Sequence, residues 1–204
     1  MNDKKLSIVV ACGGTGGHAF PGLAAAKELA KRGHDVTIWD SGRNIESSVM
    51  RNWEGKAFST GARQLTAKNA FANIGAIWRC RRQMRRNRPD VLLAMGGYAS
   101  LPPVLAAKGC SVPVVLHEAN AIPGKAVEFL SRFAKTVATS FESTASYLPG
   151  VNTVCTGLPV REDIAKGVRF GDIPENAFTV FVTGGSQGAH AVNMLASEAL
   201  AVFA

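Results

Sequence analysis

The chain has 204 residues, of which 47% are hydrophobic and 19% charged, with a formal net charge of +8 at pH 7. This composition is ordinary for a globular protein and excludes collagen-like, low-complexity and disordered chains. The length allows one sizeable domain and part of a second. The N-terminal MNDKKLS leads into a strand-like segment without a signal-peptide core, and no apolar run is as long as a membrane span, so we expect a cytoplasmic protein.

The first predicted elements are a strand over residues 5–11 and an alanine-rich helix that ends at Gly33, joined by the glycine-rich stretch ACGGTGGHAFPG. Bare backbone at such a turn lets a ligand approach closely, and the first N–H groups of the helix favour an anion. A single glycine there often serves only helix packing. Four glycines beside a threonine and a histidine favour a phosphate-type site, with residues Gly13, Gly14, Thr15, Gly16, Gly17 and His18.

The spacing limits which anion this turn binds. No Lys-Ser or Lys-Thr pair follows, which excludes the phosphate loop of nucleoside triphosphatases. Gly14, Gly16 and Ala19 fit the permissive dinucleotide pattern, and Asp40 follows the next predicted strand, residues 35–39, where a ribose-binding acid would lie. A nicotinamide-dependent oxidoreductase is therefore one alternative.

A basic helix is predicted after the short strand at residues 56–59. The segment NAFANIGAIW places Phe71, Ile74 and Trp78 on one side, and WRCRRQMRRNRPD follows with six arginines, Arg79 and Arg82 among them. A solvated helix face or nucleic acid would explain such charge, but an apolar patch rimmed by arginines suits an anionic membrane surface better, and we expect no nucleic acid. A core position for Phe71 and Trp78 remains an alternative, because a helix of an α/β domain must bury one face.

The remaining predicted strands are 90–94, 113–117, 135–139 and 152–155, mostly separated by helices. This alternation predicts an α/β, Rossmann-like parallel sheet with helices on both faces. Ligands of such sheets bind beyond the carboxyl ends of the strands. We therefore expect one site at this rim, formed by the first glycine turn, by Gly96, Gly97 and Tyr98, and by His117, Glu118 and Asn120.

The composition of the chain changes near residue 157, where glycine, proline and mixed charge replace the regular alternation of predicted strands and helices. We interpret residues 1–160 as the first domain, 161–176 as an interdomain linker and 177–204 as the strand, glycine turn and helix that open a second, incomplete domain. That helix is expected to begin near Gln187. The four cysteines, Cys12, Cys80, Cys110 and Cys155, lack metal-site spacing and are expected to be core thiols in a reducing compartment.

Five motifs carry a family resemblance: GGTGGH, GGY, HEAN followed by PGK, GLPVR and GGSQGA. In this order they resemble the MurG family, bacterial N-acetylglucosaminyltransferases that convert lipid I to lipid II. The resemblance implies a GT-B fold, in which the N-terminal domain takes the lipid acceptor and the C-terminal domain takes most of the UDP-sugar. It implies an inverting displacement without a cofactor or metal, by a peripheral enzyme on the cytoplasmic face of the membrane.

The resemblance also implies residue roles. Positions matching the family's UDP-GlcNAc contacts are Thr15, Gly16, Gly17, Asn120, Arg161 and Ser186. The glycine turns are expected to hold the acceptor diphosphate through Gly13, Gly14, His18, Gly96, Gly97 and Tyr98. His18 is the leading candidate for the base, with Glu118 next, and Arg161 with backbone dipoles would stabilise the leaving group. Two positions depart from the family: Leu158 replaces an asparagine and Ala119 a glutamine.

Partners implied by the resemblance are UDP-GlcNAc, lipid I and an anionic membrane surface. The family's donor-specificity residues correspond to positions beyond residue 204, so we expect this chain alone to transfer GlcNAc poorly. A non-catalytic, membrane-docking acceptor subunit that needs a partner donor domain is the second alternative, and the oligomeric state is open.

Overall fold

The computed structural model describes residues 4–42, 51–160, 164, 176, 178–184 and 189–203. The chain divides into two compact units, residues 1–165 and 166–204, and each is described here by itself. The predicted glycine turn of the second unit and most of the predicted linker lie outside the described residues. The proposed domain boundaries remain a prediction.

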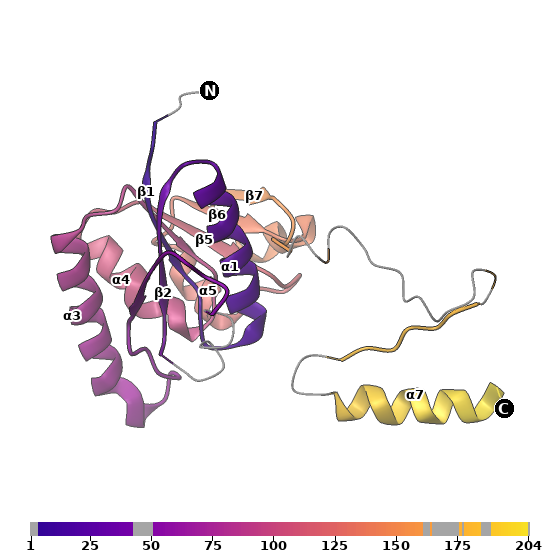
Figure 1. The fold of residues 1–204 in the computed structure, drawn as a ribbon. Helices are drawn as coiled ribbons and strands as arrows, with labels where there is room; N and C mark the ends of the chain where they lie inside the picture. Colours follow the sequence, from indigo (N-terminus) through magenta and orange to yellow (C-terminus); the bar gives the residue numbers. More distant parts are fainter. Residues whose placement is uncertain are drawn as a thin grey trace. The chain divides into compact units, whose positions relative to one another are not determined.

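The first unit is built on a seven-stranded parallel sheet in the order β3-β2-β1-β4-β5-β6-β7 (Figure 1). The strands are β1 Ser7–Ala11, β2 Asp35–Asp40, β3 Lys56–Ser59, β4 Val91–Ala94, β5 Val114–Glu118, β6 Thr136–Thr139 and β7 Thr153–Cys155. Each overlaps a strand expected from the sequence, with ends that differ by at most two residues. The predicted α/β, Rossmann-like class is confirmed.

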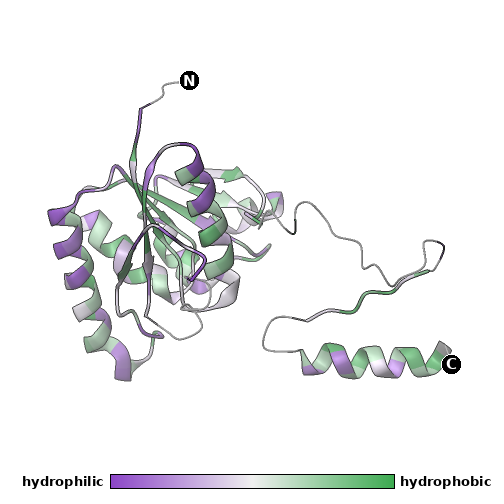
Figure 2. Ribbon diagram, viewed as in Figure 1, coloured by the Kyte–Doolittle hydropathy of each residue, from purple (hydrophilic) through white to green (hydrophobic). Residues whose placement is uncertain are grey.

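The helices of this unit fill the connections between strands. They are α1 Gly16–Lys31, α3 Ala70–Arg86, α4 Leu101–Gly109 and α5 Lys125–Ser131, with short 3₁₀ segments η1 Ala67–Asn69, η2 Tyr98–Ser100 and η3 Glu142–Tyr147. Figure 2 shows mostly hydrophobic strands inside the unit and mixed polar and apolar residues along α3.

Strand alternation divides the core into two layers. Val9 and Ala11 of β1 belong to a cluster with side chains of α3, α4 and α5, whereas Val10 and Cys12 pack with α1. Gly22 lets α1 approach closely, because a Cβ at this position would lie 2.2 Å from the Cβ of Cys12. The helices therefore cover both faces of the sheet, as the sequence predicted.

The order of strands reverses between β1 and β4. β1 pairs with β2 on one side and with β4 on the other, so the chain leaves β1 toward one edge of the sheet and leaves β4 toward the opposite edge. The segments that follow these two strands diverge, and the space above the carboxyl ends of β1 and β4 is where such sheets bind ligands. Both glycine turns of the sequence lie there.

The second unit differs from the expectation. Residues 178–184 form no strand, although the segment FTVFV was predicted to be one. A strand is defined by hydrogen bonds to a neighbouring strand, and none of the described residues of this unit provides one. The helix α7, His190–Phe203, begins three residues after the predicted start.

The cysteines are all free in the structure. Cys12 and Cys80 are buried and Cys110 is partly buried, but Cys155 is exposed, so its prediction as a core thiol is wrong. The reason is its place on β7, an edge strand with a single neighbour. Burial raises the pKa of the Cys80 thiol to about 12.

Candidate functional site

The two glycine turns of the first unit interlock. Gly14 has φ +89°, and a Cβ there would lie 2.8 Å from Cε1 of Tyr98 in the other turn. Gly97 has φ +68°, and a Cβ there would lie 2.8 Å from Nε2 of His18 in the first turn. Each glycine thus lies against a side chain of the opposite turn, and a larger residue at either position would push the turns apart.

His18 is held in a defined orientation at this junction. Its Nδ1 lies 2.9 Å from the backbone oxygen of Met95, which directly precedes the second turn. Because a carbonyl oxygen only accepts hydrogen bonds, Nδ1 carries a proton, and in the neutral ring Nε2 holds the basic lone pair. The ring is partly exposed, so a ligand at the turns has access to it.

The N-terminus of α1 adds positive potential to the same place. Thr15 is the extended N-cap, and its carbonyl oxygen accepts hydrogen bonds from the N–H groups of His18 and Ala19, at 3.2 and 3.0 Å. The N–H groups of Gly16 and Gly17 precede these bonds in the helix and have no intrahelical acceptor. The first turn contains no acidic residue, so the helix dipole there is not neutralised by its own side chains.

Glu118 belongs to a separate cluster. It is 2% exposed, and its Oε1 accepts hydrogen bonds from the backbone N–H and the side-chain amide of Asn120, at 2.8 and 2.9 Å. Its Oε2 accepts a third from the N–H of Gly124, at 2.9 Å. The carboxylate therefore closes the loop between β5 and α5 and presents Asn120, whose side chain is exposed, at the rim.

The backbones of His18, Glu118 and Asn120 lie at or beyond the carboxyl ends of strands, as expected from the sequence. Along β5, Glu118 shares a face with Leu116, which packs in the layer of α5, whereas His18 comes from α1 on the other face. The hydrogen bonds of the Glu118 carboxylate go to Asn120 and Gly124, and its convergence with His18 in one group of side chains stays a prediction. Its role as second candidate base remains a prediction that the three hydrogen bonds disfavour.

His117 connects two of the sequence motifs. It is 3% exposed, and its Nε2 donates to the backbone oxygen of Gly157, in GLPVR, at 3.3 Å. Burial lowers the pKa of His117, so the neutral ring is favoured. This histidine therefore fixes the start of the segment after β7 against the end of β5.

The remaining candidate residues from the sequence are Arg161, Ser186 and Asp40. Arg161 and Ser186 lie outside the described residues. Asp40, the possible ribose-binding acid, accepts a hydrogen bond from the N–H of Gly42 at 2.8 Å and so closes its own turn. Among the described residues, no group of three His, Cys, Asp or Glu side chains could hold a metal ion.

Comparison with known proteins agrees with this geometry. Residues 8–139 match the glycosyltransferase family 28 N-terminal domain, which covers more than half of the chain. The chain belongs to glycosyltransferase family 28. Both glycine turns and the HEAN motif lie within the matched residues.

Relatives of this family 28 chain confirm the predicted resemblance to MurG. It is 37% identical over 199 residues to the UDP-N-acetylglucosamine–N-acetylmuramyl-(pentapeptide) pyrophosphoryl-undecaprenol N-acetylglucosamine transferase of Microcystis aeruginosa, covering 94% of this chain and 55% of that protein. The Gloeothece citriformis protein of the same name is 34% identical over 206 residues, with coverages of 97% and 56%. The family 28 chain thus spans about half the length of these relatives.

The fold also resembles a solved MurG structure. The crystal structure of Acinetobacter baumannii MurG superposes with a TM-score of 0.65 at 28% identity, over 84% of this family 28 chain and 50% of that chain. The GT-B type of Rossmann-like domain that the sequence predicted is confirmed by this neighbour.

The family 28 domain carries an exposed apolar patch on α3, formed by Phe71, Ile74 and Trp78, which are 87%, 52% and 66% exposed. We call it the α3 patch. The prediction that these side chains are solvent-accessible is confirmed, and the alternative core position is wrong. The helix contains five arginines and no acidic residue, and Arg79 and Arg82 are exposed. In the described residues no helix is both long and apolar enough to cross a bilayer.

Proposed function

We propose that this chain is the acceptor-binding part of an inverting glycosyltransferase that moves GlcNAc from UDP-GlcNAc to the MurNAc 4-hydroxyl of lipid I, giving lipid II. The names of its relatives support the substrates. The observation that carries the proposal is the junction of two interlocked glycine turns at the N-terminus of α1, with the basic Nε2 of His18 at its centre.

In this proposal the two substrates lie next to each other at the first glycine turn. Gly13 and Gly14, with residues 96–98, would hold the diphosphate of the acceptor, and residues 15–17 would meet the donor at the start of α1. Backbone N–H groups and the helix dipole suit both anionic diphosphates. Because the two sets are consecutive in the chain, the reacting atoms would meet at residues 13–18.

The chemistry follows from this placement. The acceptor 4-hydroxyl oxygen attacks the anomeric carbon, a new C–O bond forms with inversion, and the bond to the UDP oxygen breaks with its electron pair on UDP. The hydroxyl proton passes to Nε2 of His18, whose Nδ1–H is held by the Met95 carbonyl oxygen. The developing imidazolium would also stabilise the diphosphate charge. Arg161 and Ser186 stay assigned to the donor as a prediction.

The α3 patch would hold the domain at an anionic membrane, where lipid I resides. Aromatic side chains enter the interface, and each nearby arginine adds about 1 kcal/mol of attraction to an anionic surface. A purely structural role, in which the basic residues stabilise the C-terminus of the helix, accounts for Arg85 and Arg86 in the last turn. It does not account for the exposed aromatic residues that precede them.

Diphosphate binding tests the proposal through Gly97. In Gly97→Ala the new methyl group displaces His18 and opens the junction, so binding of a soluble lipid I analogue should weaken by about tenfold or more. The matched control is Gly150→Ala, since Gly150 has φ +76° with no atom near its Cβ position, and it shares only the backbone strain. Equal binding by wild type and Gly97→Ala would contradict the assigned site.

Transfer is measured with labelled UDP-GlcNAc and the same analogue. We expect little product from the 204-residue chain by itself, and we expect product from a longer, active form of the chain to require His18. Turnover by this chain comparable to that of a full-length relative would show that the donor contacts are wrongly assigned. Tight analogue binding without any transfer, restored by adding the C-terminal half of a relative, would favour the separate acceptor-subunit alternative.

A further inference from the structure

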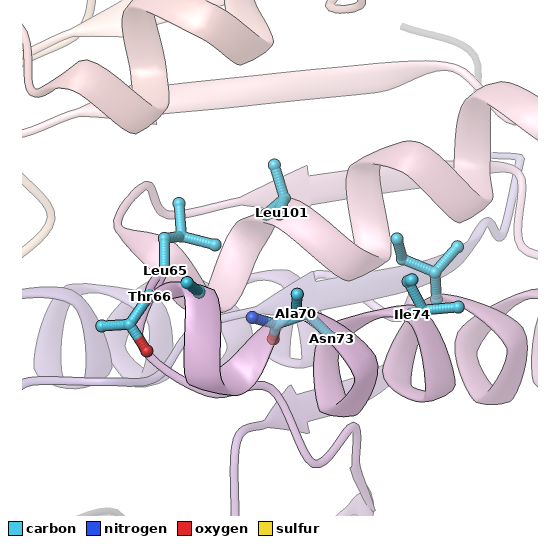
Figure 3. Close-up of a pocket in the computed structure, with 8 residues that line it drawn as sticks. Leu65, Thr66, Ala70, Asn73, Ile74 and Leu101 are labelled. Carbon is cyan, nitrogen blue, oxygen red and sulfur yellow. The ribbon is translucent and has the colours of Figure 1, made fainter.

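An apolar pocket lies between the α3 patch and the second glycine turn. It is an open pocket with a volume of about 340 Å³, bordered by the segment before α3, the first turns of α3 and the start of α4 (Figure 3). Its lining residues are Leu65, Thr66, Ala67, Ala70, Asn73, Ile74, Ile77 and Leu101. The proposed transfer step does not use this pocket, and the α3 patch shares only Ile74 with it.

The lining of the pocket is mainly aliphatic, and the oxygen of its one buried polar side chain already accepts a hydrogen bond. Asn73 is 6% exposed, and its side-chain oxygen accepts a hydrogen bond from the N–H of Arg63 at 2.9 Å. The small side chains of Ala67 and Ala70 leave the space open, and Leu65, Ile74 and Leu101 border it in Figure 3. Apolar groups of a ligand would therefore meet a mainly aliphatic lining here.

Two lining residues connect the pocket to the features on either side. Ile74 is also part of the α3 patch, so the pocket opens beside the surface proposed to meet the membrane. Leu101 begins α4 directly after η2. It therefore lies roughly 6 Å along the helix axis from Tyr98, the residue that lies against Gly14. The pocket therefore lies between the membrane-facing patch and the diphosphate turns.

We propose that this pocket holds the first isoprene units of the acceptor, those next to its diphosphate. A cavity of about 150 Å³ takes a six-carbon apolar ligand, so the pocket has room for about two five-carbon units. A polyprenyl diphosphate joins an apolar chain to an anionic group, and the structure presents an apolar pocket and an anion-binding turn joined by residues 97–101. The inference rests on the proposed function, which supplies the diphosphate at the turns.

Calorimetric titration of the 204-residue chain tests the proposal with inorganic pyrophosphate, farnesyl diphosphate and farnesol. Farnesyl diphosphate should bind more tightly than pyrophosphate by about tenfold or more, because its first isoprene units are transferred from water into the apolar pocket. Ala70→Phe and Ala67→Phe fill the pocket and should reduce that ratio to about one while leaving pyrophosphate binding unchanged. Ala72→Phe, the same change at an exposed position of α3 outside the pocket, should keep it.

The outcomes separate the two proposals. Absence of pyrophosphate binding, or binding that Gly97→Ala does not weaken, would contradict the diphosphate site itself. Normal pyrophosphate binding without a preference for farnesyl diphosphate would overturn only the pocket assignment. The pocket assignment would also be overturned if the preference for farnesyl diphosphate survived both Ala70→Phe and Ala67→Phe, or if Phe71→Ser and Trp78→Ser removed it instead. Binding of farnesol as tight as that of farnesyl diphosphate would overturn it too. Thermal unfolding of each variant confirms that it is folded.

Discussion

Replacing Glu118 with glutamine separates a supporting role from a catalytic one. The carboxylate is 2% exposed and accepts hydrogen bonds from the backbone N–H and the side-chain amide of Asn120 and from the N–H of Gly124. A glutamine has one acceptor oxygen, so in either orientation its NH₂ group faces at least one of these donors. One hydrogen bond becomes a contact between two donors in a buried place.

The structure sets the size of the effect. A hydrogen bond to a charged group contributes about 1.5–3 kcal/mol, and a buried donor left without an acceptor costs about 1–3 kcal/mol more. Removing a buried charge returns part of this sum, because the carboxylate no longer has to be desolvated on folding. We expect Glu118→Gln to lower the free energy of unfolding by about 2–4 kcal/mol, which corresponds to about 5–12 °C in Tm for a unit of this size.

Thermal unfolding followed by circular dichroism measures this shift. Glu54→Gln is the matched control, since Glu54 is exposed, and its Tm should change little. If Asn120 contacts UDP-GlcNAc as proposed, the affinity for UDP-GlcNAc should fall in Glu118→Gln, because the loop that holds Asn120 loses a hydrogen bond. An unchanged Tm with loss of transfer in a longer, active form of the chain would refute this reasoning and return Glu118 to the position of catalytic base.

Three further predictions concern other parts of the first unit. Phe71→Ser combined with Trp78→Ser should weaken binding to anionic vesicles in a sedimentation assay by about tenfold or more, without a change in Tm, because both side chains are exposed; unchanged binding would remove the membrane role of the α3 patch. Cys155 should react with a thiol reagent at pH 8 in the folded protein, whereas Cys80, with its pKa raised to about 12 by burial, should react only on unfolding; early labelling of Cys80 in a mass spectrum would contradict its burial. The pKa of His117 is lowered by burial, so the unfolded chain binds a proton more readily; stability should fall as pH decreases below about 6.5, and His117→Gln should reduce that slope in unfolding measured from pH 7 to 5.

Much of the fold could be predicted because its signals are local. Each strand of the first unit is a short apolar run bounded by turn residues, and the parallel class follows from helices between them. The segment FTVFV has the same local signal, yet residues 178–184 form no strand. Its hydrogen bonds would have to come from a neighbouring strand, and local sequence does not show whether one is present.

The site was predicted as a location more successfully than as a set of contacts. Glycine turns after β1 and β4 were expected at the rim, and both are there. The sequence did not show that Gly97 lies against His18 or that Met95 orients its ring, because these contacts join residues 77 or more positions apart. The pocket was missed for the same reason, since Leu101 meets the start of α3 only in the folded unit.

The sequence around Glu118 contained a local signal for a loop-closing role, although Glu118 was interpreted as a candidate base. An acid followed at two residues by Asn120 and at six by Gly124, the N-cap of α5, can accept hydrogen bonds from a loop that its own strand begins. Strand alternation then explains the division of work at this rim. His117 and Glu118 alternate between the two faces of the sheet, and each fixes a loop through its hydrogen bonds. The proposed chemistry is thus placed where the strand order reverses, because there the two glycine turns lie against each other through His18 and Tyr98.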